Sequence, residues 1–142
     1  MKSLVILVVM IFLHIVADYN LQGILAQMKQ KTWWYRNCKN YSDRTKFDES
    51  IYKNDYKAAL VAHSFEWTFV VLIPMLYYAH TKYYSLAYTL MYFFMFIYNF
   101  VIHYFVDDYK ANKRKINLIN DQHIHLLQIV ISWILYWAII GW

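Results

Sequence analysis

Four long apolar runs constrain this chain more than any other feature of its sequence. Residues 3–17, 58–80, 84–106 and 124–142 are rich in aliphatic and aromatic side chains and carry almost no formal charge. A helix rises about 1.5 Å per residue, so about 20 residues cross the roughly 30 Å apolar core of a bilayer. The first run reaches this length only with its polar end through Gln22. The sequence therefore predicts membrane-spanning helices over residues 3–22, 58–80, 84–106 and 124–142.

The composition supports an all-α integral membrane protein with a single domain over residues 1–142. Apolar residues make up 61% of the chain and charged residues only 16%, which is unusual for a soluble domain. The first run could instead be a signal peptide. However, Ile15, Val16 and Ala17 form a poor cleavage site before Asp18, so we expect this run to remain as a span.

Basic residues predict the orientation of the bundle. Of 14 lysines and arginines, eight lie in residues 24–57 and four in residues 107–123. Loops rich in Lys and Arg stay in the cytoplasm, so both of these loops should be cytoplasmic and both termini should lie outside. The same residues account for the net charge of +5, which makes the lipid bilayer the expected partner and no nucleic acid. No oligomeric state is predicted.

Three local features give further expectations. Residues 24–37 mix aromatic and basic side chains and should lie along the inner membrane surface. Asp48 or Asn54 is expected to cap the second spanning helix at its N-terminus. Pro74 should kink that helix, because proline removes a backbone hydrogen bond.

Acidic and imidazole side chains recur at one depth in the spans. With the predicted topology, each of the four helices places such groups at its cytoplasmic end. These are His14 and Asp18, His63 and Glu66, His103 and Asp107, and Asp121 and His125. Residues four apart share one face of a helix, so three of these sets are side-by-side pairs. An ionisable group within a bilayer costs at least about 2.5 kcal/mol, so these groups should face the bundle interior and need partners.

Two interpretations of these pairs are open. In one, each histidine hydrogen-bonds its own acid and staples a helix end. In the other, the pairs converge on a divalent metal ion, zinc or manganese before others, since a mixed shell of nitrogen and oxygen suits these ions. The candidate ligands are His14, Asp18, His63, His103, Asp107 and His125.

A metal at this depth would make hydrolysis at the membrane surface the expected chemistry. A bound cation lowers the pKa of its water toward neutrality, and Asp121 or Glu66 would take the proton or orient a ligand. The substrate would be an amphiphilic ester or phosphoester. An anionic lipid headgroup or phosphate would be held by Gln22, Lys29, Lys110 and Arg114.

A non-enzymatic role is the alternative. The protein could be an accessory subunit that binds a partner through its basic loops, or an ion-coupled transporter in which the pairs relay protons. Transporters place such groups near the midplane on broken helices, whereas these pairs lie at one edge. Metal content would separate the hydrolase from the accessory protein.

Several motifs resemble those of a known family. H-x-x-x-D-Y-x-L-Q (His14 to Gln22), a lone histidine in the second span, H-Y-F-V-D (His103 to Asp107) and D-Q-x-x-H (Asp121 to His125) occur in this order. They look like a family of small polytopic membrane proteins of bacteria and phages that is classed as a domain of unknown function. The resemblance implies a four-helix fold in a bacterial inner membrane and no established activity. A looser likeness to inner-membrane proteins catalogued as metal-dependent hydrolases favours that chemistry.

Overall fold

The computed structural model describes residues 2–39, 43, 46–82 and 86–140 of the chain. These residues are almost entirely helical and form no strand, apart from an isolated bridge between Lys39 and Phe47. Four helical segments are long and apolar enough to cross a membrane: Ser3–Leu21, Glu49–Thr81, Leu86–Ala111 and Leu118–Ile139. The prediction of an all-α chain with four candidate spans is confirmed.

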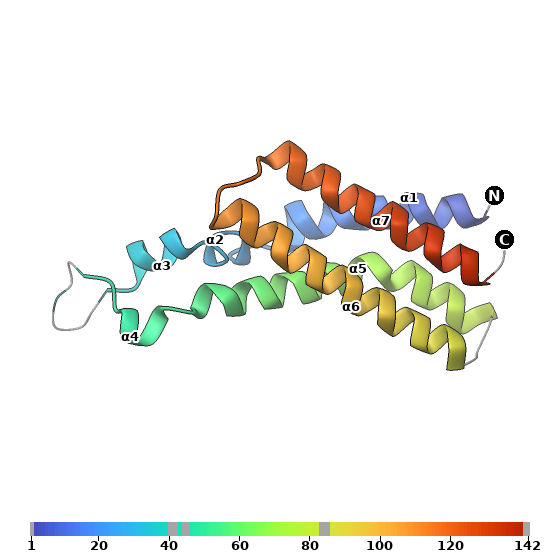
Figure 1. Ribbon diagram of the computed structural model, residues 1–142, viewed down its shortest axis with the longest axis horizontal. Helices are drawn as coiled ribbons and strands as arrows, with labels where there is room; N and C mark the ends of the chain where they lie inside the picture. Colours follow the sequence, from blue (N-terminus) through green and yellow to red (C-terminus); the bar gives the residue numbers. More distant parts are fainter. Residues whose placement is uncertain (1, 40–42, 44–45, 83–85, 141–142) are drawn as a thin grey trace.

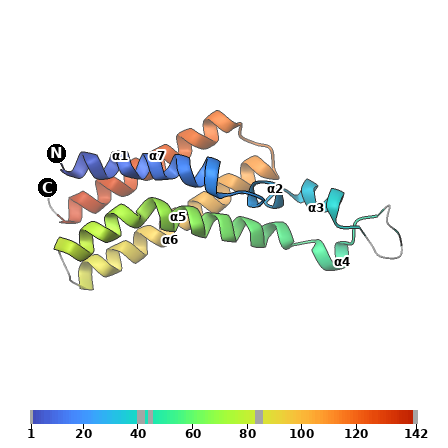
Figure 2. The same ribbon diagram turned by 180° about the vertical axis from the view of Figure 1, so that it is seen from behind.

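The long helices form an up-and-down bundle. They are α1 (Lys2–Ile15), α5 (Asp55–Lys82), α6 (Leu86–Ala111) and α7 (Leu118–Ile140). α5 packs against α1 and α6, and α7 packs against α6 and α1, so the four helices close into a ring. The start of α1 and the end of α7 lie at the same end of the bundle (Figure 1, Figure 2). Short helices extend from the opposite end.

The helices at that opposite end run further than the sequence pattern indicated. α6 continues to Ala111 and α7 begins at Leu118, so the expected loop 107–123 shrinks to residues 112–117. Asp107 and Asp121 are therefore helical. Both carboxylates have partners inside the bundle, so they need no exposure to water. At the other ends of these spans, residues 84, 85, 141 and 142 lie outside the described residues.

The first candidate span, Ser3–Leu21, changes its helical geometry before it ends. α1 passes directly into a π-helical turn, η1 (Val16–Leu21), which contains the buried Asp18. In a π-turn the backbone hydrogen bonds join residues five apart instead of four, and such turns often occur at functional sites. Gly23 follows with a φ of 46°, in the left-handed region that suits glycine, and ends the span.

Three short helices pack around the start of α5. They are α2 (Leu25–Met28), α3 (Lys31–Asn37) and α4 (Glu49–Tyr52), and Trp34, Tyr56 and Leu60 form a small core among them. In Figure 1, α3 and α4 extend beyond the bundle along its long axis. Residues 24–37 therefore pack along the start of α5, and their expected place at the inner membrane surface stays a prediction.

The structure describes the surroundings of the expected caps, Asp48 and Asn54, and of the expected kink at Pro74. Asp48 precedes α4, but its carboxylate accepts a hydrogen bond from Ser50 Oγ at 2.5 Å and caps no helix N–H. Asn54 immediately precedes α5, and its backbone carbonyl accepts a hydrogen bond from the Lys57 amide. α5 runs across Pro74 as one helix of 28 residues, a length of about 42 Å at 1.5 Å per residue.

An apolar core fills the half of the bundle that contains the chain ends. Met10, Leu72, Met75, Met95 and Ile129 are fully buried there. The outer faces of the same helices are apolar as well. Large exposed side chains cover them, among them Val8, Phe12, Phe65, Phe94, Ile97, Leu127 and Ile139. Exposed apolar area on this scale is typical of a surface that contacts lipid or another protein.

Candidate metal centre

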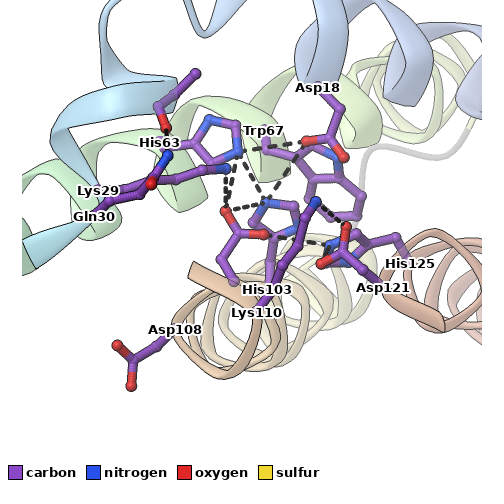
Figure 3. Close-up of polar contacts among 12 residues, drawn as sticks. Asp18, Lys29, Gln30, His63, Trp67, His103, Asp108, Lys110, Asp121 and His125 are labelled. Carbon is purple, nitrogen blue, oxygen red and sulfur yellow. Dashed lines mark hydrogen bonds and ion pairs between the residues drawn. The ribbon is translucent and has the colours of Figure 1, made fainter. Parts of the chain in front are cut away.

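Six acidic and imidazole side chains from four helical segments meet inside the bundle, near the end from which α2 extends (Figure 3). All six are buried, with at most 7% of any residue exposed. They are Asp18 from η1, His63 from α5, His103 and Asp107 from α6, and Asp121 and His125 from α7. We call these six residues the His/Asp cluster.

Helical spacing directs these side chains inward. On α6 the buried positions include Asn99, His103 and Asp107, each four residues after the last, so they form one polar stripe. Asp121 and His125 continue the same pattern on α7, where both are fully buried. These stripes face each other and carry the cluster.

The first part of the cluster surrounds His63 and His103. Their Nε2 atoms lie 3.2 Å apart, and His63 Nε2 lies 3.4 Å from both Asp18 Oδ1 and Asp107 Oδ2. His103 Nε2 lies 3.9 Å and 3.8 Å from the same two oxygens. A tetrahedral ion with bonds of about 2.0–2.2 Å holds its ligand atoms roughly 3.3–3.6 Å apart. The separations from His63 Nε2 are close to this range, whereas those from His103 Nε2 to the two oxygens are a few tenths of an ångström longer.

The second part of the cluster surrounds His125. Its Nε2 atom lies 3.5 Å from Asp107 Oδ1 and 3.5 Å from Asp121 Oδ1. The His125 ring also stacks on the His103 ring, with centroids 4.1 Å apart. Asp107 therefore belongs to both parts, with a different oxygen in each.

Several buried atoms of the cluster have no hydrogen-bond partner within the described part of the chain. Asp18 Oδ1, Asp121 Oδ1 and His125 Nε2 all face other cluster atoms without hydrogen-bond geometry. Leaving a buried polar atom unpaired costs about 1–3 kcal/mol, more for a charged group, so such atoms are rare and need an explanation. A bound cation would satisfy all three atoms at once.

Two lysines neutralise part of the negative charge of the carboxylates in the cluster. Lys29 Nζ donates to Asp107 Oδ2 at 2.6 Å, and Lys110 Nζ donates to Asp121 Oδ2 at 2.5 Å. The Asn112 side chain positions Lys29, since it donates to the Lys29 carbonyl at 3.0 Å and accepts from the Lys31 amide at 2.8 Å. Both lysines were predicted to hold a substrate anion, but in this structure they pair with acids of the cluster.

His14 lies beside the cluster and uses both ring nitrogens elsewhere. Trp67 Nε1 donates to His14 Nδ1 at 2.9 Å, and Trp can only donate, so the His14 proton is on Nε2. That nitrogen lies 3.1 Å from Gln122 Oε1 and donates to it. His14 was predicted as a metal ligand, whereas here it orients Gln122.

The remaining predicted site residues make no described hydrogen bond or ion pair with the cluster. Glu66 is half-buried, and none of the cluster's described hydrogen bonds or ion pairs involves it. Gln22 is also half-buried, and its Oε1 atom has no partner among the residues described. Arg114 is exposed in the loop between α6 and α7, with a φ of 53°.

Sequence reasoning missed three residues that organise the site. Gln122 Nε2 donates to Asp18 Oδ2 at 3.0 Å and to Asp121 Oδ2 at 3.1 Å, which links η1 to α7. Trp67 lies against the His103 ring, with centroids 4.2 Å apart. The position of Trp67 four residues after His63 was an available signal, as was the Gln122 of D-Q-x-x-H. Nothing in the sequence indicated Asn112.

A layer of neutral polar groups lies next to the cluster, deeper in the bundle. Asn99 Nδ2 donates to Ser132 Oγ at 2.7 Å, and Gln128 Nε2 donates to the Asn99 carbonyl at 2.7 Å. Both Asn99 and Gln128 are buried. These bonds hold α6 against α7 beneath the cluster.

Comparisons with known proteins leave the family of this chain open. A scan against protein-family models found no match, and searches of curated proteins and of solved structures found none either. The resemblance seen in the motifs therefore stays a prediction. Functional inference rests on the geometry of the His/Asp cluster.

Proposed function

We propose that this protein is a membrane-spanning metalloenzyme that hydrolyses an anionic amphiphile at the bilayer surface. The observation that carries the proposal is the set of buried ligand atoms without hydrogen-bond partners, at distances suited to a metal shell. Three histidines also lie near the acid four residues away, as helix staples would, with His14–Asp18 and His103–Asp107 at 3.8 Å and His125–Asp121 at 3.5 Å. Staples within single helices would not by themselves place His63 3.4 Å from acids of two other helical segments, Asp18 and Asp107.

The donor set suits zinc or manganese. Imidazole nitrogens and carboxylate oxygens are ligands of both ions, and no thiolate lies in the cluster. A bound divalent ion supplies an activated water near neutral pH. Asp121 accepts hydrogen bonds from Lys110 and Gln122 through Oδ2, which leaves Oδ1 for the ion or for its water.

Access for a substrate is best at the Lys110 side of the cluster. The Lys110 side chain is 30% exposed, whereas the Lys29 side chain is 9% exposed. A substrate that approaches from the headgroup region would first meet Lys110 and Gln122. A cation there attracts an anionic headgroup or phosphate, which supports an anionic amphiphile as the substrate class.

The membrane orientation is part of this proposal. The four apolar segments cross the bacterial inner membrane, both termini lie outside, and the cluster lies at the cytoplasmic level. The distribution of basic residues and the apolar outer faces of the bundle support it. A reporter fused to the C-terminus should be active outside the cytoplasm, and a cytoplasmic signal would contradict the orientation.

Metal analysis combined with an activity assay tests the function. Protein is purified without chelator from cells grown with added zinc or manganese, and its metal content is measured by elemental analysis. We expect at least one ion per chain, and hydrolysis of an amphiphilic phosphoester in mixed micelles that is lost with chelator and restored by metal. Protein that stays free of divalent metal would overturn the proposal.

The neutral polar layer favours ion-coupled transport as a second candidate. Asn99, Gln128 and Ser132 extend the polar interior from the cluster toward the middle of the bundle. A transporter in proteoliposomes would move protons or metal ions across the membrane without hydrolysing the substrate. Ion flux that persists without hydrolysis would favour this candidate over the enzyme.

A further inference from the structure

Asp107 occupies a special position among the acids of the cluster. Its Oδ2 atom lies 3.4 Å from His63 Nε2, and its Oδ1 atom lies 3.5 Å from His125 Nε2. These two histidines come from different helices, α5 and α7. The two oxygens of one carboxylate therefore face two neighbouring groups of nitrogen and oxygen donors, and Asp18 and His103 lie within reach of both.

Each of these groups contains enough donors for one ion. The first consists of His63 Nε2, His103 Nε2 and Asp18 Oδ1 around Asp107 Oδ2, with separations of 3.2–3.9 Å. The second consists of His125 Nε2 and Asp121 Oδ1 around Asp107 Oδ1, with His125 Nε2 3.5 Å from both oxygens. Asp18 also comes within metal-binding reach of the second group.

We propose that the cluster is a dinuclear centre in which Asp107 bridges two divalent cations. The inference rests on the proposed metal site and adds its nuclearity and its bridging ligand. A carboxylate that binds one ion through each oxygen keeps the two ions about 3.5–4 Å apart, the spacing of two-metal hydrolytic sites. All six residues of the cluster then act as ligands, and Asp18 Oδ1, Asp121 Oδ1 and His125 Nε2 each gain a partner.

Lys29 and Lys110 supply positive charge at two of the carboxylates that would bind the ions. Lys29 Nζ donates to Asp107 Oδ2 and Lys110 Nζ donates to Asp121 Oδ2. Two divalent ions outweigh the charge of the three carboxylates, so metal loading weakens the hold of the acids on both lysines. The released ammonium groups and the ions then favour a phosphate group, which carries enough negative charge to balance the site.

Metal stoichiometry is the first test. Full-length protein in detergent micelles is stripped with chelator, dialysed and titrated with Mn²⁺, and bound metal is counted by elemental analysis after desalting. We expect two ions per chain. A single ion would overturn the bridge while leaving the proposed function intact, and no bound ion would overturn both.

Electron paramagnetic resonance of the Mn²⁺-loaded protein is the second test. Two ions bridged by Asp107 should give the broadened spectrum of a spin-coupled pair, unlike the six-line pattern of an isolated ion. Two bound ions that both give the isolated pattern would contradict the bridge. The readout depends on distance between ions and needs no knowledge of the substrate.

Asp107→Asn and Asp108→Asn form a matched pair for the bridge itself. An amide oxygen binds one ion but the amide nitrogen binds none, so Asp107→Asn should reduce the stoichiometry from two ions to one and abolish the coupled spectrum. Asp108 accepts a hydrogen bond from Asn112 and pairs with Lys113, away from the cluster. Asp108→Asn should keep two coupled ions, and its loss of the coupled signal would overturn the assignment.

His125→Phe is the second variant, in case Asp107→Asn does not fold. Phenylalanine keeps an aromatic ring against His103 but removes the donor of the second group. The variant should bind one Mn²⁺ with the isolated six-line spectrum. Retention of two coupled ions by folded His125→Phe protein would overturn the proposal.

Discussion

The two halves of this bundle are built from the same helices and bury very different groups. Toward the chain ends, α5, α6 and α7 bury Met75, Met95 and Ile129. Few polar atoms are buried in this region: Tyr136 donates to the Met75 carbonyl at 2.9 Å, whereas Tyr92 Oη and Trp137 Nε1 have no hydrogen-bond partner among the described residues. Toward the other end, the same helices bury charged side chains, and three of their ligand atoms, Asp18 Oδ1, Asp121 Oδ1 and His125 Nε2, have no hydrogen-bond partner in the described part of the chain.

This difference separates stability from binding. Packed apolar side chains stabilise the fold without any ligand, whereas buried unpaired donors and acceptors destabilise it until something binds them. A protein that keeps such buried unpaired groups has a binding site whose side chains need little rearrangement when a ligand binds. The following predictions test whether the two halves divide in this way.

The largest effect is expected from the double variant His63→Phe and His125→Phe. It removes one nitrogen donor from each part of the cluster but keeps the aromatic rings, so bound metal should fall to background. The unfolding free energy of the metal-free protein should fall, because Asp18, Asp107 and Asp121 stay buried but lose the imidazole nitrogens that face them at 3.4–3.5 Å. Elemental analysis and thermal unfolding with chelator measure the two quantities. Full metal occupancy would disprove ligation by these residues.

Met75→Ala should lower the unfolding free energy but leave metal binding unchanged. Met75 is fully buried in the apolar half, and truncation of such a side chain costs about 2–5 kcal/mol. Metal per folded chain should equal that of wild type. Leu76→Ala, at an exposed neighbouring position, is the matched control and should be close to neutral in thermal unfolding. A loss of metal in folded Met75→Ala protein would show that the halves are coupled.

Gln122→Met should weaken metal binding without abolishing it. Gln122 donates to Asp18 and Asp121, and loss of such a supporting hydrogen bond typically costs about 10–100-fold in metal affinity. A competition titration against a metal-sensitive dye measures this. His123→Ala, at the exposed adjacent position, should leave the affinity unchanged. Equal affinities for wild type and Gln122→Met would mean that Gln122 does not orient the ligands.

Glu66→Gln should have the smallest effect. Glu66 was one of two predicted catalytic acids, but the structure leaves it outside the described contacts of the cluster. Metal occupancy and phosphoester hydrolysis should therefore match wild type. A large loss of hydrolysis with unchanged metal content would restore Glu66 as a catalytic residue and would require the substrate to reach its side of α5.

Much of the architecture follows from the sequence. Apolar runs of bilayer length predicted four helices, since only a helix satisfies its own backbone hydrogen bonds in lipid. Four-residue spacing predicted the stripes on α6 and α7 that carry His103, Asp107, Asp121 and His125. Both inferences need only periodicity and length, and the structure contains the helices and the stripes.

The sequence by itself thus determined which helices form and which faces are polar, but the tertiary structure decided the partners. Spacing within a helix paired His14 with Asp18. His14 Nδ1 does lie 3.8 Å from Asp18 Oδ2, but the packing of α5 and α7 against α1 added hydrogen bonds from Trp67 and to Gln122, and the π-turn brought Asp18 toward His63. The sequence likewise predicted that the lysines bind a substrate. In the structure, α6 and α7 extend past the expected loop boundaries, and Lys110 pairs with Asp121. Contacts between helices depend on rotation and depth across the bundle, which no local pattern encodes. For that reason only the folded chain shows one carboxylate, Asp107, facing two neighbouring groups of ligand atoms.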